Sequence, residues 1–250
     1  MSVSVIFRII NALGVIPIYL IGKKFFNKEV GFISALIFAI SFEQTQYAMY
    51  VGNPSLAIFS FLLLFYGTAL IDKDKKEKGL ILMFASVSLG IQLEFILIYM
   101  VPLLVILLFL LRDRLKIIKL RTWVIAFVSA FLILSTFFLA ELKFNFQMTK
   151  SVINLLKTGY HVIPEGKNRI TLYVDMFLRL VKHNTLDISN TSILFILVIL
   201  SLSFLLFYAK RNYVLRFILA WVFASVLILP LGGYNAYFVN VGVGIGIIIG

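Results

Sequence analysis

The chain has 250 residues, of which 62% are hydrophobic, and it contains repeated apolar runs of about 20 residues, which excludes a water-soluble domain and predicts a polytopic membrane protein. The formal net charge is +12, but charged residues make up only 14% of the chain and cluster in short connections, so the charge indicates membrane topology and not a nucleic-acid partner. The absence of cysteine excludes disulfides, a thiol nucleophile and cysteine metal ligands.

The apolar segments predict an all-α bundle of about nine transmembrane spans. These are expected at 3–21, 30–44, 54–71, 79–93, 95–111, 122–140, 192–209, 215–231 and 236–250. Alternate connections carry 15 of the 23 lysines and arginines, which places them on the cytoplasmic side of the plasma membrane. The connections at 41–53, around 92–94 and at 232–237 carry none and are expected outside.

The segment from Leu80 to Leu111 is ambiguous because one helix of that length would extend about 48 Å, far more than an apolar core of about 30 Å. Both of its flanks are basic and therefore lie on the same side. The segment is predicted to be a hairpin of two short spans, with Gln92 and Glu94 at its outer apex. By the same logic the polar stretch SFEQTQYAMYVGNPSL, 41–56, lies at the extracytoplasmic surface.

Three parts are expected: helices with short outer loops at 1–140, an extracytoplasmic loop at 141–191, and further spans at 192–250. The long loop is predicted to contain amphipathic interfacial helices, one around 170–181 and a second around 146–156. The loop has a net charge of +3, which is read either as a site for an anionic ligand such as a lipid phosphate or as ordinary headgroup contact.

The two ends of the chain are unusual for a complete membrane protein. Nothing precedes the first span to translocate it, and the last span stops at Gly250 without a polar flank. A piece of a longer protein is expected, with an N-out protein and a short final helix as the alternative. Arg8 and Asn11 lie inside the first span, where such side chains are costly unless they face protein, water or a lipid phosphate.

Four segments carry a family resemblance in their order and spacing: RIINALGVIPIYLIGKKFF, SFEQTQYAMYVGNPSLAIFSFLLLFYG, SLGIQLEFILIYMVPLLVILL and FLAELKFNFQMTKSVINLL. Over about residues 5–160 the chain resembles the bacterial family 39 glycosyltransferases, of the dolichyl-phosphate-mannose protein mannosyltransferase and aminoarabinose transferase type. The resemblance implies a GT-C fold that transfers sugar from a polyprenyl-phosphate donor on the outer face. It also implies a catalytic carboxylate in a first outer loop, which would precede Met1.

The chain departs from the family pattern in the outer turns. Where relatives have Tyr-Ser-Arg and then Trp-Asn-Pro, this chain has Tyr47, Ala48 and Met49, followed by Gly52-Asn53-Pro54. Glu94 stands where relatives have a histidine. These changes leave the donor sugar open.

Sugar transfer needs a base for the acceptor hydroxyl, cations or a metal for the leaving phosphate, and side chains that orient the sugar. Glu43 and Glu94 are the candidate carboxylates within this chain. Substrate-binding candidates are Gln44, Gln46, Tyr47, Tyr50, Asn53, Gln92, Glu141, Lys143, His161, Arg179 and Lys182. A divalent metal is the candidate cofactor, although no ligand motif identifies it.

Structural interpretations of these residues stay open beside the functional ones. Asn53-Pro54 is a good helix start, the tyrosines suit an interfacial aromatic belt, and Glu43 and Glu94 are readily solvated at an interface. The expected acceptor is a lipid, a glycan or a protein. A transporter or lipid flippase and a noncatalytic membrane subunit are the alternative functions.

Overall fold

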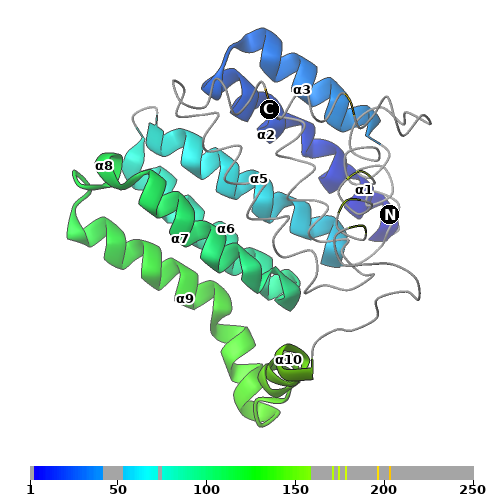
Figure 1. Ribbon diagram of the computed structural model, residues 1–250, viewed down its shortest axis with the longest axis vertical. Helices are drawn as coiled ribbons and strands as arrows, with labels where there is room; N and C mark the ends of the chain where they lie inside the picture. Colours follow the sequence, from blue (N-terminus) through cyan, green and yellow to red (C-terminus); the bar gives the residue numbers. More distant parts are fainter. Residues whose placement is uncertain are drawn as a thin grey trace.

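The computed structural model describes residues 3–41, 53–72 and 75–158, with a few isolated positions beyond them. Within these residues all regular structure is helical. The elements are α1 (Val3–Leu13), α2 (Val15–Phe25), α3 (Lys28–Ile40), α5 (Asn53–Asp72), α6 (Lys76–Leu93), the 3-10 helix η1 (Phe95–Tyr99), α7 (Met100–Leu110), α8 (Arg112–Leu115), α9 (Leu120–Lys143) and α10 (Gln147–Thr158). Figure 1 shows the longer helices between α1 and α9 packed as a bundle with roughly aligned axes.

The first six predicted spans coincide with described helices, whereas the three predicted at 192–209, 215–231 and 236–250 lie outside the described residues. Two described segments, Val5–Phe25 and Leu120–Lys143, are long and apolar enough to cross a membrane, judged by length and composition. Other apolar helices are shorter, Leu56–Ile71 and Met100–Leu110 among them. The total of nine spans therefore stays a prediction.

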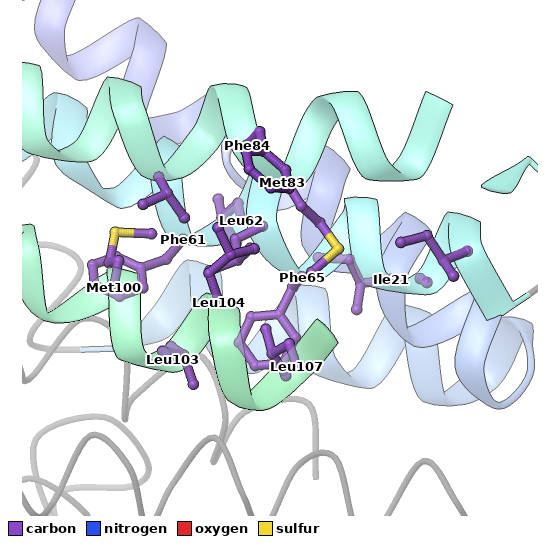
Figure 2. Close-up of a cluster of buried hydrophobic side chains, with 14 of the residues drawn as sticks. Ile21, Phe61, Leu62, Phe65, Met83, Phe84, Met100, Leu103, Leu104 and Leu107 are labelled. Carbon is purple, nitrogen blue, oxygen red and sulfur yellow. The ribbon is translucent and has the colours of Figure 1, made fainter. Parts of the chain in front are cut away.

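The core lies between α5, α6 and α7, with α2 packed against α5. Figure 2 shows Phe61 of α5 beside Met100 of α7, and Phe65 of α5 beside Met83 of α6 and Leu107 of α7, and all of these side chains are buried. Polar side chains inside these helices bond to their own backbone: the hydroxyls of Ser60, Thr68, Ser86 and Ser88 each donate to a carbonyl three or four residues earlier. Such bonds satisfy the hydroxyls where water is excluded.

Glycines allow the helix pairs to approach closely. A Cβ added at Gly79 of α6 would lie 2.6 Å from Gly67 O of α5, and one added at Gly31 of α3 would lie 2.6 Å from Tyr19 O of α2. Only a residue without a side chain permits this backbone contact. The α5–α6 and α2–α3 pairs are therefore tightly packed antiparallel hairpins.

Aromatic pairs show that α6 and α9 run in the same direction. Phe84 lies edge-on to Phe127, with ring centroids 4.8 Å apart, and Phe95, just after α6, stacks on Phe137 at 5.1 Å. Positions further along α6 thus meet positions further along α9. The basic starts of both helices consequently lie at one end of the bundle and their polar ends at the other.

The outer surface of α9 is apolar. Its exposed side chains include Val124, Phe127, Phe131, Leu132 and Leu139. A continuous apolar face of this length on an exposed helix suits contact with lipid or with a further helix.

Candidate functional site

Within the described residues the basic turns gather at one end of the bundle, as the alternation of charge in the sequence predicts. Figure 1 shows α8 at that end, while the N-terminus and α10 lie at the opposite end. At the basic end, Lys116 Nζ donates to Asp113 Oδ1 at 2.9 Å, and this hydrogen bond holds the pKa of the Asp113 carboxyl below its usual value. The opposite end carries the polar turns and is the candidate site.

Glu94 stands at the break between α6 and η1, so the apolar run from Leu80 to Leu111 is divided at the predicted position. Its backbone is extended, with φ −145° and ψ 111°. The Glu94 N–H donates to Gly90 O at 2.8 Å and ends α6, while the Glu94 carbonyl accepts from Leu97 N–H at 2.9 Å in the turn that follows. The side chain is half-buried, and this burial raises the pKa of the Glu94 carboxyl. A carboxyl whose charged form is disfavoured by burial, in a turn between two apolar helices, is a candidate for proton transfer.

The residues beside Glu94 connect this turn to α9. Gln92, in the last turn of α6, is exposed. The Phe95 ring lies almost parallel to that of Phe137, with an angle of 8° between the ring planes. Phe137 is about one helical turn before Glu141. The predicted residues Gln92, Glu94, Glu141 and Lys143 therefore lie at the same end of the bundle.

Glu141 has a structural role that the sequence did not predict. Its side chain is buried, and Oε1 accepts the Met148 N–H at 3.2 Å while Oε2 accepts the Thr149 N–H at 3.0 Å and the Thr149 hydroxyl. These are N–H groups of the first turn of α10, which have no partner within the helix. Glu141 thus caps α10 from the end of α9, and a role in substrate binding stays a prediction.

The sequence predicts the helix that Glu141 caps, but it does not predict the cap itself. The amphipathic segment around 146–156 predicts a helix, and the start of any helix needs hydrogen-bond acceptors. The identity of the acceptor depends on the turn between α9 and α10, where Asn145 and Phe146 adopt positive φ values of 53° and 57°. Positive φ is uncommon for residues other than glycine, so this turn was not predictable from composition.

Several predicted site residues lie outside the described residues. They are Glu43, Gln44, Gln46, Tyr47, Tyr50, His161, Arg179 and Lys182. Asn53 is the first residue of α5, consistent with a helix start at this position. Lys143 is exposed, with its Nζ 5.5 Å from the centroid of the Phe144 ring.

Two further features bear on ligand binding. Within the described residues, no group of three or more His, Asp or Glu side chains is placed to hold a metal ion, and the possible divalent metal stays a prediction. Asn11 of α1 is buried, and its Nδ2 is the one buried side-chain nitrogen or oxygen within 3–41, 53–72 and 75–158 that lacks a hydrogen-bond partner. Arg8, almost one helical turn earlier, is exposed.

The helical bundle and its polar end agree with a membrane glycosyltransferase of the mannosyltransferase type. A family model described as dolichyl-phosphate-mannose-protein mannosyltransferase matches residues 1–139, more than half of the chain, and the chain belongs to this family. Members are integral membrane proteins, and the described residues include two segments, Val5–Phe25 and Leu120–Lys143, that are long and apolar enough to cross a membrane. The match begins with α1 and ends within α9, two residues before Glu141. No curated protein and no solved structure gives a significant match.

Proposed function

We propose that the chain transfers a sugar from a polyprenyl-phosphate donor to an acceptor on the extracytoplasmic side of the plasma membrane. The observation that carries this proposal is the position of Glu94, a half-buried carboxyl in a turn at the end of the bundle opposite the basic turns. By the distribution of lysine and arginine, the basic end faces the cytoplasm and Glu94 faces outside.

In the proposed reaction an acceptor hydroxyl attacks the anomeric carbon of the donor sugar. The bond between that carbon and the phosphate oxygen breaks, and polyprenyl phosphate leaves with the bonding electron pair. A carboxylate takes the proton of the hydroxyl, and a nearby cation stabilises the phosphate. Glu94 is our candidate among the described residues for the proton acceptor or for a sugar contact, and exposed Lys143 is the candidate cation at the same end.

Glu43 and a carboxylate upstream of Met1 are the other candidates for the base. Gln92 and Asn53, together with Gln44, Gln46, Tyr47 and Tyr50, are proposed to orient sugar hydroxyls. His161, Arg179 and Lys182 are proposed to bind the donor phosphate from the loop above. Of these residues, Glu94 offers the sharpest test because its surroundings are described and its helix contains a matched control.

The test compares Glu94→Gln with Glu77→Gln in the product of the full gene. Glu77 is an exposed carboxylate in the first turn of the same helix, at the basic end. Transfer of labelled mannose from dolichyl phosphate mannose to endogenous acceptors is measured in membranes containing equal amounts of each variant. If Glu94 accepts the proton, Glu94→Gln should lower the rate about 100-fold while Glu77→Gln leaves it unchanged. Equal rates in both variants would remove Glu94 from the site.

A further inference from the structure

The turn between α9 and α10 forms an elbow, defined here as residues 141–150, which lies beyond the family match. Figure 1 shows α10 turned away from the axis of α9 and seen nearly end-on. The positive φ angles of Asn145 and Phe146 produce this change of direction. Because α9 has the length and composition of a membrane span, a helix that crosses its axis at the outer end lies close to the plane of the membrane.

The elbow exposes large apolar side chains. Leu142, Phe144, Phe146 and Met148 are between 47% and 60% exposed. They continue the apolar outer surface of α9, where Leu139 is also exposed. In water, an exposed cluster of this kind would be unfavourable, so its position directly beyond a membrane helix indicates contact with lipid.

The charge of the elbow is complementary to a phospholipid surface. Lys143 and Lys150 are both exposed, and the Lys143 ammonium lies against the Phe144 ring. The one acidic side chain, Glu141, is buried and already accepts three hydrogen bonds from α10. The exposed charge of the elbow is therefore positive, and lysines beside apolar and aromatic side chains are typical of segments at the headgroup level.

The sequence of α10 has the same two-sided character. Apolar residues recur at 148, 152, 155 and 156, the spacing of one helical face, and lysines occur at 150 and 157. Glu141 holds the first turn of this helix to the end of α9 through backbone and hydroxyl groups. The cap thus fixes the angle at which the amphipathic helix leaves the membrane span.

We propose that the elbow docks into the headgroup layer of the outer leaflet, with its apolar side chains among the upper acyl chains and Lys143 and Lys150 on lipid phosphates. The docking of the elbow does not require sugar transfer, because it requires only that α9 crosses the membrane. Lys143 is used by both proposals, as a contact of headgroup phosphate here and of the donor phosphate there, whereas Lys150 is used here alone. A second protein covering the elbow is the alternative that the test must separate.

The test places a single tryptophan at the elbow of the complete chain. Trp123 and Trp221 are replaced by phenylalanine, and Phe146→Trp is introduced in vesicles of phosphatidylcholine and phosphatidylglycerol. Quenching by lipids brominated near the headgroup is compared with quenching by lipids brominated near the chain ends and with quenching by aqueous iodide. Leu132→Trp, on the exposed middle of α9, is the matched control for a deep position.

Phe146→Trp should be quenched at least twofold more by shallow than by deep bromolipids, whereas Leu132→Trp should show the reverse order. Replacing Lys143 and Lys150 by glutamine should reduce the shallow quenching in anionic vesicles. Strong iodide quenching without bromolipid quenching would overturn the proposal, and so would protection from all three quenchers, which indicates a protein cover. If Phe146→Trp does not fold, Phe144→Trp gives the same comparison.

Discussion

The close approach of α5 and α6 makes Gly79→Ala a sharp test of the packing. An added Cβ would lie 2.6 Å from Gly67 O, 2.7 Å from Ile71 Cγ1 and 2.9 Å from Ile71 N. Ordinary contact begins at 3.4 Å, so α5 would have to retreat by about 0.8 Å. Two of the three opposing atoms belong to the backbone, which cannot rotate away as a side chain can.

The magnitude follows from two opposing effects. Overpacking a core costs about 1–3 kcal/mol, while alanine is favoured over glycine inside a helix by about 1 kcal/mol. Gly90→Ala is the matched control because it lies in the same helix and gains the same preference. There the nearest atom is the Met100 sulfur at 2.8 Å, at the flexible end of a side chain that can adjust. The two variants should therefore differ by about 2 kcal/mol.

Thermal unfolding of the purified protein in one detergent measures this difference. For a chain of this size 2 kcal/mol corresponds to about 4–8 °C in Tm, so Gly79→Ala should unfold at a temperature lower by that amount than Gly90→Ala. Equal Tm values for the two variants would show that α5 and α6 do not meet backbone to backbone at Gly67.

Three further predictions concern single polar groups. Burial raises the pKa of the Glu94 carboxyl, so the contribution of this carboxyl to stability is complete below its ordinary pKa of about 4.5 and is lost as the pH rises through the raised pKa. The Tm of Glu94→Gln relative to wild type should therefore increase from pH 4 to pH 8. A Tm difference that does not change with pH would refute the burial of the carboxyl. Glu141→Ala removes the cap of α10 and should lower the free energy of local unfolding at the start of that helix by about 1–2 kcal/mol. Amide hydrogen exchange at Met148 and Thr149 should become at least tenfold faster. Unchanged exchange at these two amides would contradict the cap. Asn11→Leu should raise stability by about 1 kcal/mol, because it removes a buried donor without a partner; a lower Tm would show that the Asn11 amide has a partner in the folded protein.

The sequence by itself predicted the helices of the described residues and the gathering of their basic turns at one end of the bundle. The length of the apolar run from Leu80 to Leu111 and its basic flanks were sufficient to predict a break at Glu94, because a membrane core limits how long one span can be. The alternation of basic and uncharged turns likewise predicted that the lysine-rich connections gather at one end of the bundle. Both predictions follow from local composition and from the thickness of the apolar membrane core, so no knowledge of helix packing was needed.

The tertiary structure decided which helices touch and what the polar groups do there. Gly67 and Gly79 are close in sequence, yet only the packed hairpin shows that their backbones meet. Glu141 was predicted as a substrate-binding residue from its charge and position, which stays a prediction. The structure adds a second role, because its carboxylate accepts N–H groups at the start of α10 after the turn in which Asn145 and Phe146 have positive φ angles. Contacts of this kind depend on the path of the turn and on helix orientation, which residue spacing along the chain does not specify.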